Sequence, residues 1–190
     1  MNTLFIAAMT AVLAATGPGG VKKEMPPDPV RVEGDRIAFS LPDLEGNMVA
    51  LTDKRFEGKV VMVALWGTWC GTCRSEIPLL KKLQDKYKDQ GFEIIGLSFE
   101  NLDTDKAWAR VAAFVEKQEM NYLVLKGGLV EEVEAKIEHV KGYRGFPTSF
   151  FVGRDGTFRH AKEDYVAGED DVKIEGIIEE LLKESAPVAK

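Results

Sequence analysis

The feature that most constrains the fold is a nearly continuous apolar run, Lys59 to Trp66, which ends just before the cysteine pair Cys70 and Cys73. A run without polar alternation is typical of a central strand that is buried on both faces. An amphipathic helix is predicted beyond the cysteines, because apolar residues recur at helical spacing at Ile77, Leu80, Leu83 and Tyr87. Gly91 is well placed to end that helix. The chain is therefore expected to pass from a buried strand, through the cysteines, directly into a helix.

The pattern from Arg36 onward predicts further strands and helices. The expected strands are Ile37 to Leu41 and Met48 to Leu51 around a turn at Glu45-Gly46-Asn47, then Phe92 to Phe99, Tyr122 to Leu125, and a hairpin of Thr148 to Val152 and Thr157 to His160 around Asp155-Gly156. The expected helices are one capped by Asp103 or Thr104, one carrying Leu129, Val133 and Ile137 before Gly142, and a final one carrying Ile174, Ile177, Ile178 and Leu181. This order predicts an α/β sandwich with a mixed sheet.

Four segments are expected along the 190-residue chain: a signal or leader segment at 1–20, a linker at 21–35, one domain at 36–184 and a tail at 185–190. The apolar run Leu4 to Ala15 resembles the core of a secretory signal and is shorter than the roughly 20 residues that a membrane-spanning helix needs. An extracytoplasmic location is therefore expected, either periplasmic or attached to a membrane through the N-terminus. No Lys or Arg precedes Lys22, so a misassigned start and a cytoplasmic leader are the alternatives.

Charge and cysteine content narrow the class of function. The net charge of −6 argues against a nucleic-acid partner, which needs a concentrated positive surface. Two cysteines are too few for a disulfide-rich scaffold, and a structural zinc site normally has four ligands. The two histidines, His139 and His160, lie far apart without ligand spacing and are expected to be structural or exposed. The pair therefore favours redox chemistry, with no cofactor or metal beyond the redox-active disulfide itself.

The expected position of the cysteines gives this chemistry a physical basis. A helix N-terminus carries unpaired N–H groups and partial positive charge, so it stabilises a thiolate at Cys70. That thiolate attacks a substrate disulfide, and Cys73, one helical turn on, resolves the mixed disulfide. A Cys-x-x-Cys pair alone is a weak signal, because zinc sites and structural disulfides also contain it. The preceding strand, the following helix and Pro78 strengthen it.

The motif Trp69-Cys70-x-x-Cys73, with Pro78 and a distant Phe146-Pro147-Thr148, resembles the thioredoxin superfamily. The longer pattern, from Gly58-Lys59-Val60-Val61 to Arg74-x-Glu76-x-Pro78, is similar to the TlpA/ResA-like extracytoplasmic thiol–disulfide oxidoreductases. The resemblance covers roughly Phe39 to Leu182. It implies a thioredoxin-like three-layer sandwich with a central mixed β-sheet, an N-terminal β-hairpin and an extra strand–helix insertion.

The resemblance also implies roles for individual residues. Pro147 would follow a cis peptide bond beside the cysteines, and the Phe146 backbone would be presented to an extended substrate. Trp69 would flank the site as an apolar docking surface. Thioredoxins carry a buried acid six residues before the first cysteine, where this chain has Ala64. We therefore expect Glu76 to accept the proton of Cys73, the alternative being a solvated helix glutamate.

The remaining side chains near the motif carry weaker expectations. Trp66 is expected to pack inside the domain. Arg74 could stabilise the Cys70 thiolate, although an ordinary exposed helix residue is the favoured interpretation. The dipeptide Gly71-Thr72 lacks the proline of many relatives, which leaves the reduction potential open.

Relatives of this type commonly reduce disulfides of exported proteins, for example the haem-attachment cysteines of apocytochrome c, with electrons from a membrane thiol protein. Protein disulfide substrates, such a donor and a monomeric state are accordingly expected. A dithiol oxidase or isomerase is the main alternative. A peroxiredoxin is disfavoured, because Thr68 lies only two residues before Cys70. A copper-delivery protein would need His139 or His160 near Cys70 with Pro147 in the way. A binding domain with a structural disulfide would not explain the strand-to-helix position of the pair.

Overall fold

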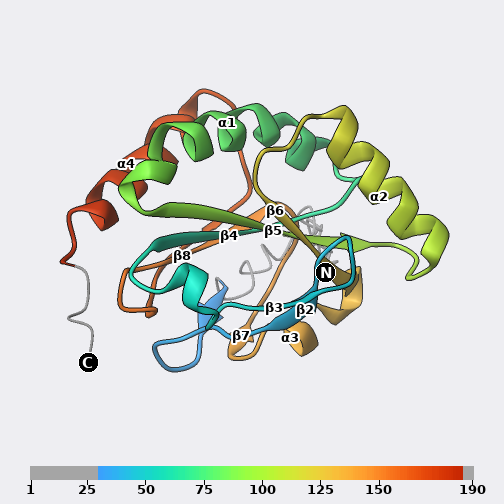
Figure 1. The fold of residues 1–190 in the computed structure, drawn as a ribbon, viewed down its shortest axis with the longest axis horizontal. Helices are drawn as coiled ribbons and strands as arrows, with labels where there is room; N and C mark the ends of the chain where they lie inside the picture. Colours follow the sequence, from blue (N-terminus) through green and yellow to red (C-terminus); the bar gives the residue numbers. More distant parts are fainter. Residues whose placement is uncertain (1–29, 186–190) are drawn as a thin grey trace, which may run out of the picture.

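The fold is built on a five-stranded sheet, seen in a computed structural model that describes residues 30–185 (Figure 1). The strands are β4 (Val60–Trp66), β5 (Phe92–Glu100), β6 (Leu123–Leu129), β8 (Thr148–Val152) and β9 (Phe158–Glu163), in the order β6-β5-β4-β8-β9. β4 pairs with β5 and β5 with β6 in parallel, whereas β8 runs antiparallel to both β4 and β9. The sheet is therefore mixed, as the sequence predicts.

Successive residues of β4 point to opposite faces of the sheet and separate two cores. On one face, Val60, Met62 and Ala64 pack under the helices α1 (Gly71–Tyr87), α2 (Asp105–Lys117) and α4 (Glu169–Leu182). On the other face, Val61, Val63 and Leu65 pack under the hairpin of β2 (Ser40–Pro42) and β3 (Met48–Ala50), together with α3 (Val133–Lys136). Figure 1 shows these groups on opposite sides of the sheet, which confirms the predicted three-layer sandwich.

The central strand and helix form where the apolar pattern places them. All seven residues of β4 are buried, which explains its lack of polar alternation. Helix α1 begins directly after Cys70 and continues through a short 3₁₀ turn, Lys88–Gln90. Gly91 then adopts a left-handed conformation with φ of 84°, which glycine tolerates without steric cost. The predicted stop at Gly91 is confirmed.

The predicted helix around Leu129, Val133 and Ile137 is present, but it is short. β6 extends to Leu129, because its last residues pair with β5, with Glu100 opposite Leu129. Only a 3₁₀ turn, Val130–Glu132, and the single-turn α3 follow. The apolar residues at this spacing are nevertheless buried, Val133 at 1% exposed and Ile137 at 0%. Strand pairing at Leu129 therefore delays the start of the helical segment, which runs only from Val130 to Lys136.

The described end of the expected linker, residues 30–35, is part of the fold. β1 (Arg31–Val32) pairs antiparallel with β7 (Val140–Lys141), and Val30 is buried. The expected leader, the linker up to residue 29 and the tail from residue 186 lie outside the described residues. Within residues 30–185, no helix combines the length and apolar character required to cross a membrane.

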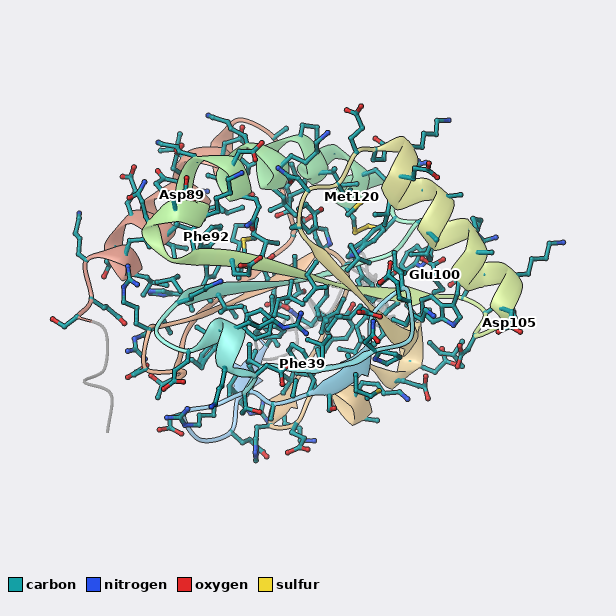
Figure 2. The ribbon with its side chains drawn as sticks, in the orientation of Figure 1. Phe39, Asp89, Phe92, Glu100, Asp105 and Met120 are labelled. Atoms are coloured by element: carbon teal, nitrogen blue, oxygen red, sulfur yellow. A yellow bond between two sulfur atoms is a disulfide. The ribbon has the colours of Figure 1, made fainter. Side chains whose placement is uncertain are left out.

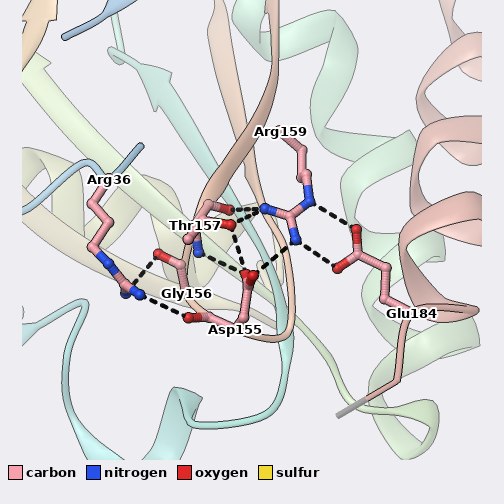
Figure 3. Close-up of polar contacts among 6 residues, drawn as sticks. All are labelled: Arg36, Asp155, Gly156, Thr157, Arg159 and Glu184. Carbon is pink, nitrogen blue, oxygen red and sulfur yellow. Dashed lines mark hydrogen bonds and ion pairs between the residues drawn. The ribbon is translucent and has the colours of Figure 1, made fainter. Parts of the chain in front are cut away.

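The C-terminal end of the described chain is tied to the β8–β9 hairpin (Figure 3). Arg159 donates from Nε to Glu184 Oε1 at 2.8 Å and from Nη2 to Glu184 Oε2 at 3.1 Å. The same Nη2 donates to Asp155 Oδ2 at 3.1 Å. From the other side, Arg36 donates to the backbone carbonyls of Asp155 and Gly156. These contacts lock the hairpin turn between the N-terminal and C-terminal segments of the domain.

Candidate active site

Cys70 and Cys73 form a disulfide at the junction of β4 and α1, with their Cα atoms 5.3 Å apart. Cys70 is the N-cap of α1, and its Sγ accepts a hydrogen bond from the backbone N–H of Cys73 at 3.1 Å. Both residues are nearly buried, at 6% and 2% exposed. The sulfur of Cys70 therefore lies where the unpaired N–H groups of the helix stabilise negative charge.

The loop before the cysteines is held by short contacts. The backbone N–H of Cys70 donates to the carbonyl of Gly67, and the indole Nε1–H of Trp69 donates to the carbonyl of Phe99 at 2.9 Å. A Cβ atom at Gly67 would lie 2.4 Å from Trp69 Nε1 and 2.5 Å from the Phe99 carbonyl oxygen. Only glycine fits there. This role of Gly67 was not predicted from the sequence, although a glycine directly after a buried strand is a signal of close backbone approach.

The Phe146–Pro147 peptide bond is cis, as the family resemblance predicts. Because Thr148 pairs with Leu65, this peptide lies at the same edge of the sheet as the cysteines. The Phe146 ring meets the Trp69 ring edge to face, with centroids 5.3 Å apart. Trp69 is 42% exposed, whereas Trp66 is buried at 5%. The predicted docking residues Trp69, Phe146 and Pro147 are thus brought together.

An open pocket of about 370 Å³ borders the cis peptide. Its lining combines Phe146 and Pro147 with Arg144, Gly145, Glu163 and Asp164. Arg144 donates from Nε to Glu163 Oε1 at 2.8 Å, and the backbone N–H of Asp164 donates to the Pro147 carbonyl at 2.9 Å. The pocket therefore has an apolar wall on the side of Phe146 and a charged, paired wall on the side of β9.

Glu76 is buried, at only 3% exposed, so the alternative of a solvated helix glutamate is wrong. It follows Cys73 by three residues, a spacing that puts both side chains on the same face of α1. Its carboxyl group makes no hydrogen bond or ion pair within residues 30–185. Burial raises the pKa of Glu76 to about 8, opposed by the charge of Lys162 and reinforced by Asp170 and Asp171. The Lys162 ammonium itself pairs with Asp170 at 3.0 Å.

The side chains of the other residues singled out from the sequence make no polar contact with the cysteine pair within residues 30–185. Arg74 is exposed on α1, as the favoured interpretation expects. Ala64 is buried in the core, and His139 and His160 are both exposed. Across residues 30–185, no group of three or more His, Cys, Asp or Glu side chains is arranged to hold a metal ion.

Glu100, the last residue of β5, was not among the site residues predicted from the sequence. Its side chain is fully buried and accepts hydrogen bonds from Thr68 in the loop before Cys70. The signal available in the sequence was its position at the carboxyl end of a strand parallel to β4. The carboxyl ends of parallel strands meet at one edge of a sheet, which is where ligands and catalytic groups of α/β folds gather.

The sheet order, the disulfide at the start of α1 and the cis-proline beside it define the class of thioredoxin-fold proteins. The model of the AhpC/TSA family matches residues 33–161, which is more than half of the sequence. The chain therefore belongs to the AhpC/TSA family.

Curated relatives are named thiol-disulfide oxidoreductase ResA. The one from Bacillus thuringiensis subsp. konkukian is 38% identical over 120 residues, which are 62% of this chain and 61% of the relative. The one from Bacillus anthracis is 33% identical over 143 residues, 75% of this chain and 74% of the relative. Among solved structures, a putative thiol:disulfide interchange protein DsbE from Chlorobium tepidum has a TM-score of 0.66 over 80% of this chain and 99% of its own. At 24% identity, it supports the fold alone.

Proposed function

We propose that the protein is a thiol–disulfide oxidoreductase whose Cys70–Cys73 pair exchanges with the disulfides of protein substrates. The observation that carries the proposal is the disulfide at the N-cap of α1, where the Cys73 N–H donates to Cys70 Sγ. The names of the curated relatives support the same activity.

In the reducing direction, the Cys70 thiolate attacks one sulfur of a substrate disulfide. A mixed disulfide forms between Cys70 and the attacked sulfur of the substrate. The other substrate sulfur leaves as a thiolate and takes up a proton. Cys73 then loses its proton and attacks Cys70 Sγ, which restores the observed disulfide and releases the second substrate thiolate. Two electrons pass from the dithiol of the enzyme to the substrate. A dithiol donor returns the enzyme to its reduced state by the same steps in reverse.

Glu76 is the proposed proton acceptor for Cys73 in this cycle. A pKa of about 8 lies close to that of an ordinary thiol, about 8.5, so proton transfer between the two groups is nearly balanced in energy. In the observed disulfide state, Glu76 is mostly protonated at neutral pH. It is then ready to protonate Cys73 when a donor opens the disulfide.

Trp69, Phe146 and Pro147 are the proposed docking residues. The exposed indole of Trp69 and the neighbouring Phe146 ring offer an apolar contact beside the disulfide. Residues on both sides of a substrate cysteine would lie against this surface. An extended substrate chain would pair with the backbone of Phe146, because the Pro147 carbonyl already accepts from Asp164.

The direction that we propose is reduction of disulfides in exported proteins, including the haem-attachment cysteines of apocytochrome c. A thiol protein of the membrane would supply the electrons, and the protein would act outside the cytoplasm as a monomer. The apolar run Leu4 to Ala15 and the similarity of the cysteine motif to TlpA/ResA-like proteins support this assignment. A dithiol oxidase or isomerase is the alternative, and the reduction potential separates the two directions.

Trapping the mixed disulfide tests the exchange itself. Cys73→Ser, first reduced, is mixed with a disulfide-bonded model peptide and analysed by mass spectrometry without reductant. We expect a covalent adduct on Cys70, and none in the matched variant Cys70→Ser, because Cys73 is the resolving thiol. An adduct in Cys70→Ser alone would reverse the assigned roles, equal adducts would refute the distinction between them, and no adduct in either variant would refute the proposed function.

A further inference from the structure

Glu100 is a fully buried carboxylate with an unusual set of donors for a strand residue. Its Oε1 accepts from the backbone N–H of Thr68 at 2.8 Å and from Ser98 Oγ at 3.2 Å. Its Oε2 accepts from Thr68 Oγ1 at 2.7 Å and lies 3.6 Å from Arg110 Nη2 of α2. Burying a charged group is costly unless every lone pair is satisfied, and apolar replacements are often as stable. A role beyond stability therefore has to be considered.

The register of the sheet explains why this carboxylate meets the loop before Cys70. Ser98 of β5 lies opposite Trp66 of β4, so Glu100 lies level with Thr68, two residues beyond the end of β4. Figure 2 shows Glu100 at one end of β5, near the start of α2, and Phe92 at the other. The preceding residue, Phe99, accepts the indole N–H of Trp69 through its carbonyl. Two successive residues of β5 thus hold two successive residues of the loop.

These contacts reach the sulfur through a short covalent path. Thr68 is held by Glu100, Trp69 is held by Phe99, and the next residue is Cys70, whose own N–H bonds back to Gly67. Thr68, Trp69 and Cys70 thus each make such a contact. The loop therefore has no independent freedom to change the position of the Cys70 backbone at the start of α1.

We propose that Glu100 is a positioning residue of the redox site, acting through Thr68 to hold Trp69 and Cys70 in the geometry used for disulfide exchange. The inference rests on the proposed function and adds to it a residue outside the cysteine motif. The partners of Glu100 are Thr68, Ser98 and Arg110, and it acts on the sulfurs only through the loop. It fixes the attacking sulfur at the N-cap and the indole at the docking surface.

The chain offers matched variants for a test. Thr68→Val removes the hydroxyl donor at nearly constant shape, whereas Thr68→Ser keeps the hydroxyl. Glu100→Gln removes the charge and keeps the shape. Glu93→Gln is the control, because Glu93 occupies the opposite end of β5 and pairs with Lys59 at 3.0 Å. Each full-length variant is reduced and mixed with a disulfide-bonded model peptide, and the rate constant of exchange is measured alongside the midpoint of urea unfolding.

We expect Thr68→Val and Glu100→Gln each to slow exchange by about tenfold, the effect of losing one charge-assisted hydrogen bond at a positioned group. Thr68→Ser and Glu93→Gln should keep the wild-type rate. The double variant Thr68→Val/Glu100→Gln should be no slower than Glu100→Gln alone, because the hydroxyl contact that Thr68→Val removes is one of those that Glu100→Gln already weakens.

Wild-type rates in Thr68→Val and Glu100→Gln, with the fold retained, would overturn the inference, and so would equal slowing in Thr68→Ser and Thr68→Val. If Glu100→Gln does not fold, Thr68→Val against Thr68→Ser decides alone, because both leave the carboxylate and its backbone partner in place. Failure of the wild type itself to exchange would instead refute the proposed function, so the two failures are distinguishable.

Discussion

Glu76→Gln is expected to make the protein more stable than the wild type at high pH, with little difference at low pH. Burial raises the pKa of Glu76 from 4.5 to about 8. Between these values the folded chain holds a proton that the unfolded chain has lost, so the free energy of unfolding falls as the pH rises. The contribution is fully present below pH 4.5 and is lost as the pH passes through 8. Glutamine cannot ionise, and the variant therefore lacks this loss.

The size of the effect follows from the width of this pH window. At about 1.4 kcal/mol per pH unit, the free energy of unfolding falls by about 5 kcal/mol across this window. Relaxation around a buried charge reduces such penalties, so a gain of about 3–5 kcal/mol for Glu76→Gln over the wild type is expected at pH 9. At pH 5 both side chains are neutral in the folded proteins, and the two proteins should agree within about 1 kcal/mol.

Urea unfolding of the disulfide-bonded proteins, followed by circular dichroism from pH 5 to pH 9, measures this difference directly. Asp85→Asn is the control, because Asp85 is exposed on the same helix and its ion pair within residues 30–185 is with the exposed Lys88. Its difference from the wild type should stay within a few tenths of a kcal/mol at every pH. A difference between Glu76→Gln and the wild type that does not change with pH would refute the reasoning about burial.

Three further substitutions test the site and the fold. Gly67→Ala should destabilise the fold by about 1–3 kcal/mol and alter Trp69 fluorescence, because its Cβ would overlap the indole and a backbone oxygen; unchanged urea midpoint and emission would contradict this. Phe146→Ala should raise the KM for a disulfide-bonded peptide several-fold, since it removes the aromatic partner of Trp69. The reduction potential should not change, and an unchanged KM would argue against the docking surface. Glu184→Ala should lower stability by about 1 kcal/mol at low salt through loss of the half-exposed pair with Arg159, and by less at high salt, as urea unfolding would show.

The sequence predicts the centre of this fold well, because its pattern there has only one good solution. The apolar run at β4 is too short for a membrane span and too continuous for a surface strand, so it had to be buried on both faces. The helical spacing from Ile77 to Tyr87 likewise has one apolar face, and that face is buried. The pairing of Phe146-Pro147 with a motif more than 70 residues earlier came from the family resemblance, since nothing local fixes a contact of that range.

The errors have physical causes of their own. The segment from Leu129 to Ile137 is helical as predicted, but pairing of Leu129 with Glu100 extends β6 and shortens the helix to a 3₁₀ turn and one α-helical turn. Glu100 reads as a surface residue at a strand end, because only the sheet register brings it to Thr68. The family resemblance, and not the local pattern, predicted Glu76 beside the cysteine pair, and its burial agrees with that prediction. In each case tertiary packing decided, and local pattern did not.

The reduction potential of Cys70–Cys73 tests the central claim most directly. The oxidised protein is equilibrated with glutathione or dithiothreitol buffers of graded potential, and the free thiols are counted; the chain has only these two cysteines. We predict a single two-electron transition from no thiols to two, near the roughly −270 mV of thioredoxin for a reductase. A midpoint near −120 mV, roughly that of a strong disulfide oxidant, would reverse the proposed direction. Two thiols that persist at every potential would contradict the claim that this pair is redox-active.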